Sequence, residues 1–131
     1  MKRILGVAVV LVAILSAAGI ALRPSFAADA GKKEPVRFKV LNTFKPDLAG
    51  IEKAQLIQFE MDPGAEVKNF KLPASEILWV TRGVFTYKYA DKTVLRKQGE
   101  SWLHEEGIVL DVSNKTKGGA VLRGVQFIKA K

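Results

Sequence analysis

The chain has 131 residues, enough for one domain, and its 21 lysines and arginines against 13 acidic residues give a net charge of +8. It contains no cysteine, which excludes disulfides and thiolate metal sites. The basic residues are scattered rather than clustered with stacking aromatics, so we expect no nucleic-acid partner.

The N-terminal part of the chain has the pattern of a secretory signal. A positively charged start and an apolar run from Ile4 to Leu22 precede small residues around two acceptable cleavage points, Ala27 and Ala30. We therefore predict a signal peptide over 1–27, a linker over 28–35, and export to the periplasm or out of the cell. The apolar run is also about long enough to cross a bilayer, so the alternative is an uncleaved membrane anchor.

From Val36 onward, apolar and polar residues alternate in short runs that are separated by turn signals, and no helical periodicity is sustained. Strands are predicted at 36–40, 54–61, 93–96, 108–112 and 120–128. Residues 76–90 read as two strands around a tight turn at Gly83. This pattern of short strands and turns predicts an all-β domain over 36–131, built as an antiparallel sandwich or a small barrel.

Two spans in this domain have glycines, a glutamate and an asparagine at fixed spacings. Gly64–Gly83 reads GAEVKNFKLPASEILWVTRG, and Gly99–Asn114 reads GESWLHEEGIVLDVSN. They match, without a gap, the spacing of the two cupin motifs, G(x)5HxH(x)3E(x)6G and G(x)5PxG(x)2H(x)3N. The positions that agree in residue type are Gly64, Glu76, Gly83, Gly99, Gly107 and Asn114. The chain therefore resembles a member of the cupin superfamily over roughly 36–129.

The resemblance implies a single antiparallel jelly-roll barrel with an internal cavity, in a family that commonly forms homodimers. In metal-dependent cupins, the positions of Phe70, Leu72, Glu76 and Leu110 would hold the ion. The three hydrocarbon side chains have no lone pairs for a metal, and one carboxylate does not make a site. We therefore predict no metal, no cofactor and none of the metal-dependent activities of the family.

Five residues are candidates for a ligand pocket inside the barrel: Phe70, Leu72, Glu76, Leu110 and Trp79. Glu76 is either an acid, base or hydrogen-bonding anchor in the cavity, or a residue that pairs with a nearby lysine or arginine or tilts toward solvent. His104 is the only histidine and falls on no ligand position of the motifs. Because it precedes a predicted turn at Gly107, we expect it at the surface.

These residues favour an exported protein that is not an enzyme. We expect it to bind a small, partly apolar molecule, or to fill its barrel and work structurally through its surface. A homodimer is a further expectation, and membrane contact is expected only through an uncleaved N-terminal segment. The alternative is a metal-independent enzyme of the epimerase or isomerase type, with Glu76 as its acid–base group.

Overall fold

The computed structural model describes residues 34–131. The predicted signal segment 1–27 and most of the predicted linker 28–35 lie outside this range. Residues 34–131 contain no helix that is long and apolar enough to span a bilayer. Their strands are β1 (Val36–Phe44), β2 (Ile51–Met61), β3 (Glu66–Lys71), β4 (Ser75–Arg82), β5 (Val84–Lys88), β6 (Thr93–Lys97), β7 (Ser101–His104), β8 (Val109–Ser113) and β9 (Ala120–Lys129).

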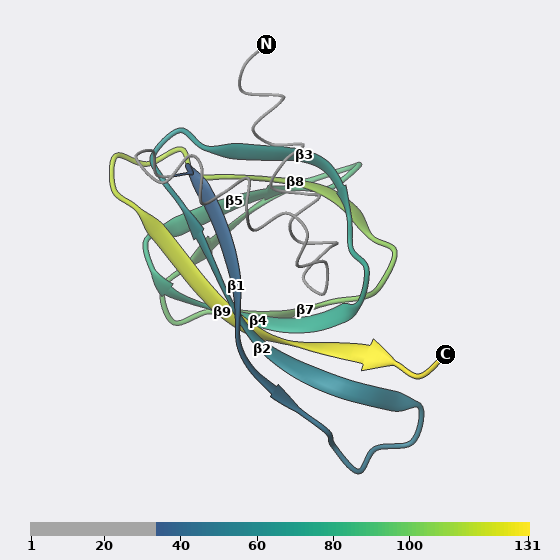
Figure 1. The fold of residues 1–131 in the computed structure, drawn as a ribbon. Coiled ribbons are helices and arrows are strands. Elements are labelled where there is room, and N and C mark those ends of the chain that lie inside the picture. The colour runs from purple at the N-terminus through teal and green to yellow at the C-terminus, as the bar shows by residue number, and fades with distance from the viewer. Residues whose placement is uncertain (1–33) are drawn as a thin grey trace.

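The strands form two antiparallel sheets that face each other (Figure 1). The first sheet has the order β1-β2-β9-β4-β7, and the second has the order β3-β8-β5-β6. The core lies between them, where Met61, Phe85 and Leu122 are almost fully buried. The all-β prediction is therefore confirmed, and the two sheets form a cupin-like sandwich.

The alternation of side chains along each strand decides which of them are buried in the core. In β4, Glu76, Leu78 and Val80 are buried, whereas Ile77 between them is 42% exposed. Successive side chains of a strand point to opposite faces, so the even-numbered residues from Glu76 to Val80 face the interior. This parity places Glu76 inside the sandwich.

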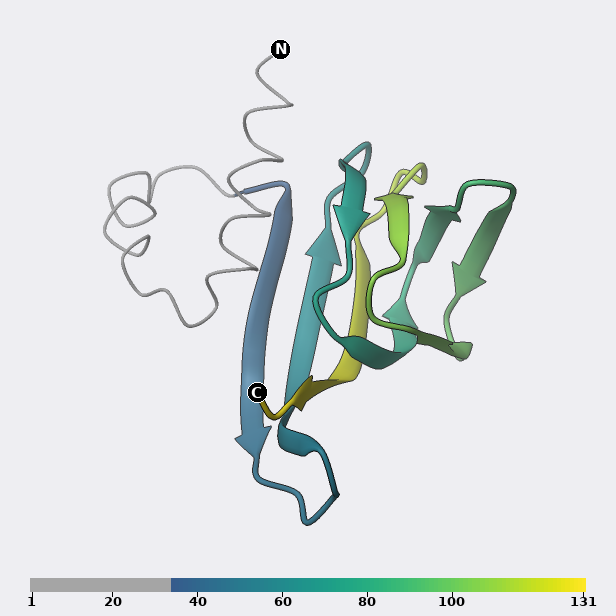
Figure 2. The same ribbon diagram turned by 90° about the vertical axis from the view of Figure 1, so that its right-hand side faces the viewer.

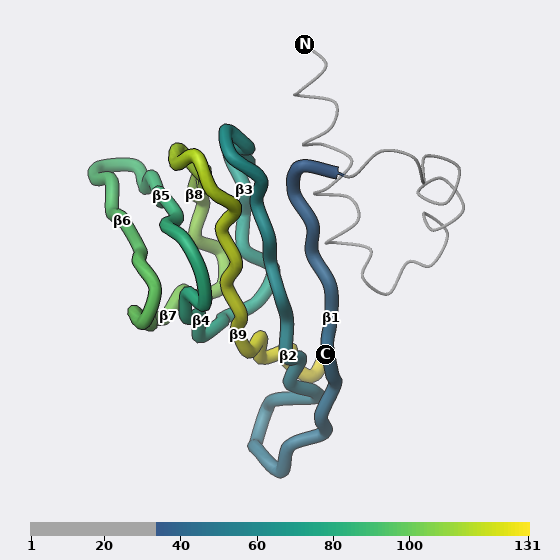
Figure 3. The backbone as a smooth tube through the Cα atoms, turned by 90° about the vertical axis from the view of Figure 1, so that its left-hand side faces the viewer, coloured from purple at the N-terminus to yellow at the C-terminus, as the bar shows by residue number. Residues whose placement is uncertain are grey.

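One two-stranded ribbon projects beyond the rest of the sandwich. The far halves of β1 and β2 extend past the second sheet and end in an exposed loop (Figures 2 and 3). A bulge interrupts the pairing between Val40 and Asn42, and the Ala130 amide donates to the Gly50 carbonyl over 3.0 Å. The end of β9 is thereby held against the end of the loop that joins β1 to β2.

The turn at Gly83 differs from the predicted hairpin. The two strands that it joins, β4 and β5, belong to different sheets, so Gly83 is a corner between the sheets. Its φ is +76°, and an added Cβ would lie 2.7 Å from the Gly119 carbonyl oxygen. Glycine is needed here both for the positive φ and for the close approach of another loop.

The predicted strand positions are correct in outline and too short at the ends. The first strand continues to Phe44, and the second begins at Ile51. The structure adds β3 and β7, two strands that the prediction lacked. The β3 sequence EVKNFK has few apolar residues, and a bulge with Asn69 at a φ of 53° interrupts its alternation.

Asn114, the last residue of the second motif, is a structural residue. It is fully buried, and its Nδ2 donates to the carbonyls of Met61 at 3.0 Å and Gly118 at 2.7 Å. Its Oδ1 accepts from the backbone amide and the hydroxyl of Thr116. These bonds tie the loop before β9 to the end of β2.

Candidate functional site

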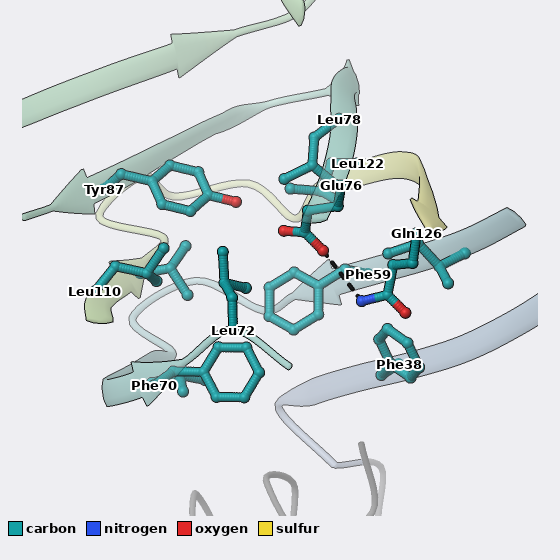
Figure 4. A pocket seen from close by; sticks show the side chains of 13 residues that line it. Phe38, Phe59, Phe70, Leu72, Glu76, Leu78, Tyr87, Leu110, Leu122 and Gln126 are labelled. Carbon is teal, nitrogen blue, oxygen red and sulfur yellow. Dashed lines mark hydrogen bonds between the residues drawn. The ribbon is translucent and has the colours of Figure 1, made fainter. Parts of the chain in front are cut away.

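A small pocket of about 50 Å³ lies between the two sheets, close to Glu76 (Figure 4). Except for Glu76 and Gln126, all the residues that line it are aliphatic or aromatic. The aromatic members are Phe38, Phe59, Phe70 and Tyr87. The predicted combination of an apolar cavity with Glu76 as a polar group is therefore present, with Gln126 as a second polar group.

Four of the five predicted site residues come together at this pocket. Phe70, Leu72, Glu76 and Leu110 all line it, and Phe70 and Leu110 are cross-strand partners in β3 and β8. Thus the four positions that correspond to metal ligands in the motifs surround one space. Among residues 34–131, no group of three or more His, Cys, Asp or Glu side chains is placed to hold a metal ion.

Trp79 does not line the pocket, and this part of the prediction is wrong. It is half-buried and lies opposite Arg123 and Ser101 on the neighbouring strands. It lies three positions after Glu76, and in a strand this odd offset places the two side chains on opposite faces. Trp79 therefore belongs to the outer face of the first sheet.

The pocket approaches solvent between two edge strands. Phe38 in β1 and Phe70 in β3 are the only lining residues that are half-buried, and all the others are buried. These strands are edges of the first and second sheet respectively. The two phenylalanines therefore form the outer wall of the pocket, and Glu76 lies deeper.

Glu76 is 5% exposed and sits in the middle of a row of polar side chains. Its cross-strand partners are Gln126 in β9 and His104 in β7. The Gln126 Nε2 donates to Glu76 Oε1 over 3.1 Å (Figure 4). The expectation that Glu76 pairs with a lysine or arginine or tilts toward solvent does not hold within residues 34–131, because Glu76 faces away from solvent and no lysine or arginine there forms an ion pair with it.

His104 is buried, with 2% of its surface exposed, so its predicted surface position is wrong. Its Nδ1 lies 3.4 Å from Glu76 Oε2, a long contact, and its Nε2 lies 2.6 Å from the Tyr89 hydroxyl oxygen. A signal was available in the sequence. His104 follows Trp102 by two residues, so a strand that buries Trp102 also directs His104 inward.

His104 contacts a polar group through each of its ring nitrogens. Its Nδ1 faces Glu76 Oε2, and its Nε2 faces the Tyr89 hydroxyl. A carboxylate offers only acceptors, so a proton on Nδ1 would be directed at Glu76, whereas a hydroxyl can donate or accept. Glu76 therefore accepts from Gln126 through one oxygen and contacts the imidazole through the other.

Two tyrosines, the buried Tyr87 and the half-buried Tyr89, complete this polar region. Burial, and next the charge of Glu76, raise the pKa of Tyr87 well above its ordinary value. Burial also raises the pKa of Tyr89, although Arg96 opposes this effect. Both hydroxyls therefore keep their protons at neutral pH. The Tyr87 hydroxyl points toward the Glu76 side of the pocket (Figure 4).

The fold resembles many solved structures. A protein of unknown function from Rhizobium leguminosarum aligns with a TM-score of 0.63 and 13% identity, covering 79% of this chain and 91% of that one. A cupin domain from Bordetella pertussis aligns with a TM-score of 0.56 and 17% identity, covering 76% and 98%. A cupin-like protein from Thermotoga maritima aligns with a TM-score of 0.55 and 25% identity, covering 70% and 67%.

The similarity is one of structure rather than of sequence. No family model matches the chain, and no curated protein matches it. The cupin resemblance that the motif spacing indicated is confirmed in three dimensions.

Proposed function

We propose that this cupin-fold chain is an exported binding module that holds a small, partly apolar molecule in its barrel without a metal. The observation that carries the proposal is the pocket itself. Phe70, Leu72 and Leu110 make its wall apolar, and Glu76 and Gln126 supply hydrogen-bonding groups at one end. Ligand sites commonly combine an apolar lining with a few such polar groups.

The size of the pocket limits the ligand. A space of about 50 Å³ holds roughly three or four water molecules. Protein interiors normally pack without voids larger than a water molecule, so an apolar space of this size next to a carboxylate favours binding over a purely structural role. The group that enters has only a few non-hydrogen atoms, and any larger part of the ligand lies outside Phe38 and Phe70.

Filling the pocket tests this proposal. Small molecules with an apolar body and one polar end are screened by NMR against the wild-type protein and against Leu110→Trp. Leu110 is 3% exposed and lines the pocket, so the larger ring is expected to abolish binding. Val109→Trp is the matched control, because Val109 is the preceding residue, is 52% exposed and does not line the pocket. Binding that survives Leu110→Trp would place the ligand elsewhere.

The metal-free part of the proposal has its own measurement. Elemental analysis of protein purified without chelators is expected to find far less than one equivalent of manganese, iron, nickel, copper or zinc. Hydrocarbon side chains at three of the four motif positions support this expectation. Stoichiometric metal that is lost in Glu76→Ala would overturn it.

Export is tested on the protein recovered from its own cells. The charged start, the apolar run and the small residues that follow it support cleavage between Ala27 and Ala30. Intact-mass measurement of protein from the cell envelope or medium is expected to show loss of the residues before that point. Full-length protein in the membrane would favour the anchor, and full-length protein in the cytoplasm would refute export.

A second candidate function follows from the hydrogen bonds of Glu76. Gln126 donates to its carboxylate and His104 lies 3.4 Å from it, which positions a candidate general base beside an apolar pocket. Such a base suits a metal-independent epimerase or isomerase. Once a ligand is known, exchange of its C–H protons with D₂O in the wild type, lost in Glu76→Gln without loss of binding, would support catalysis. Binding with no exchange would leave the binding module alone.

A further inference from the structure

We propose that the ligand is an organic cation whose small alkylammonium group lies against Glu76 in a pocket that four aromatic side chains help to line. This inference rests on the proposed binding function and names the chemical class of its ligand.

The first argument is the set of partners around Glu76. Its carboxyl group is 5% exposed, accepts a hydrogen bond from the Gln126 amide and lies 3.4 Å from His104 Nδ1. Within residues 34–131, the only basic group within 4.0 Å of this carboxyl group is the imidazole, and no lysine or arginine pairs with it. A buried carboxylate is stabilised by an opposite charge, and a bound cation would provide one from the pocket.

The second argument is the wall of the pocket. Four aromatic rings line the pocket that also contains Glu76, those of Phe38, Phe59, Phe70 and Tyr87 (Figure 4). Aromatic faces attract cations through the ring quadrupole, and the attraction is stronger where water is excluded. A neutral ligand gains only the apolar contact. An anion would meet the Glu76 carboxylate.

The third argument is access. The half-buried Phe38 and Phe70 stand between solvent and the buried carboxylate, so an entering head group passes the aromatic rings first. The volume of about 50 Å³ suits a primary ammonium or a singly methylated one. The alkyl chain behind the charge is directed back toward these two rings.

The test compares three probes of similar size on isotopically labelled protein produced from the full chain. Propylammonium, propan-1-ol and propionate are titrated at pH 7.5, and the amide signals of Phe70, Glu76 and Tyr87 are followed. Propylammonium is expected to bind at least about tenfold more tightly than propan-1-ol, and propionate is expected not to bind.

Two variants separate the contributions of charge and rings. Glu76→Gln keeps the shape of the side chain and is expected to reduce propylammonium affinity to that of propan-1-ol. Phe70→Leu keeps an apolar wall and is expected to weaken propylammonium more than the alcohol. Glu66→Gln, at a carboxylate that is 45% exposed on β3, is the control for general charge and is expected to change neither affinity.

The outcomes distinguish this inference from the proposed function. If propan-1-ol binds as tightly as propylammonium, the cation class is wrong, while the binding pocket stands. If propionate binds most tightly, the pocket favours a negative rather than a positive ligand, and the argument from Glu76 is wrong. If none of the probes shifts the pocket signals, both the cation class and the binding function fall.

Discussion

Glu76 and His104 are direct cross-strand partners in β4 and β7, and their side chains meet on the inner face of the sheet with Oε2 3.4 Å from Nδ1. Gln126 lies on the other side of Glu76 and donates to Oε1 over 3.1 Å. A carboxylate can accept on both sides at once, because it has two acceptor oxygens and no donor. The row therefore depends on the residue in its middle being an acid.

Glu76→Gln is expected to destabilise the fold. A glutamine has one oxygen and one NH₂ group, so it can accept from only one neighbour and must turn a donor toward the other. A buried donor left without an acceptor costs about 1–3 kcal/mol, and we expect a loss of that size in urea unfolding at pH 7.5. Glu66→Gln, whose paired Lys68 is also exposed, is expected to change stability by less than about 0.5 kcal/mol. A neutral or stabilising Glu76→Gln would mean that burying the charge costs more than its hydrogen bonds return.

His104 is expected to carry a proton on Nδ1. A carboxylate offers only acceptors, and Glu76 Oε2 lies 3.4 Å from Nδ1, whereas the Tyr89 hydroxyl 2.6 Å from Nε2 can donate or accept. ¹⁵N NMR at pH 7.5 reads the tautomer directly, since the chain has only one histidine. Tyr89→Phe removes the donor and is expected to increase the share of the other tautomer. A wild-type spectrum with the proton on Nε2 would contradict this prediction, because His104 would then donate to the Tyr89 oxygen.

Alkaline pH is expected to destabilise the protein through its tyrosines. Burial, and next the charge of Glu76, raise the pKa of Tyr87, and burial raises the pKa of Tyr89. The unfolded chain therefore loses these protons first, from about pH 10 upward, and the stability present below that pH falls as the pH rises. Urea unfolding between about pH 8.5 and 11.5 measures the slope.

Tyr87→Phe isolates the larger of these two effects. It keeps the ring and removes the titrating hydroxyl, so the alkaline loss of stability is expected to be smaller than in the wild type. Absorbance near 295 nm gives an independent reading, because Tyr87 and Tyr89 are the only tyrosines of the chain. An unchanged slope in the variant would show that Tyr87 is accessible to water.

Much of the fold was predictable because its signals are local. Alternation marked the strands, and the glycines at motif positions do adopt positive φ, as at Gly64 with 80° and Gly107 with 90°. The assignment of strands to sheets was not predictable in the same way. Gly83 looks like a hairpin turn in the sequence, and only the packing of Gly119 and Ala120 against it makes it a corner between the two sheets.

The residues of the site also differ in whether a local signal in the sequence identifies them. The motif spacing identified Phe70, Leu72, Glu76 and Leu110, because each lies at a fixed distance along the chain from a turn glycine. Gln126 was missed because it joins the site through pairing of β4 with β9, and this contact spans 50 residues. His104 and Trp79 were errors of a different kind. In both cases the alternation of side chains along the strand, which is a local signal, predicts the observed position.

Gly124 provides a final test of the packing between β9 and β4. An added Cβ there would lie 2.4 Å from Leu78 Cδ2 and 2.7 Å from the Ile77 carbonyl oxygen. The side chain of Leu78 can move, but the carbonyl belongs to a paired strand in the middle of the sheet. Gly124→Ala is therefore expected to lower the free energy of unfolding by about 1–3 kcal/mol, since overpacking outweighs the smaller gain from a stiffer unfolded chain. Gly118→Ala is the control, because nothing lies within 4 Å of its added Cβ, and it is expected to be close to neutral. Equal stability of the two variants in urea unfolding would show that β4 and β9 can separate enough to accept a methyl group, and that Leu78 is not held against Gly124.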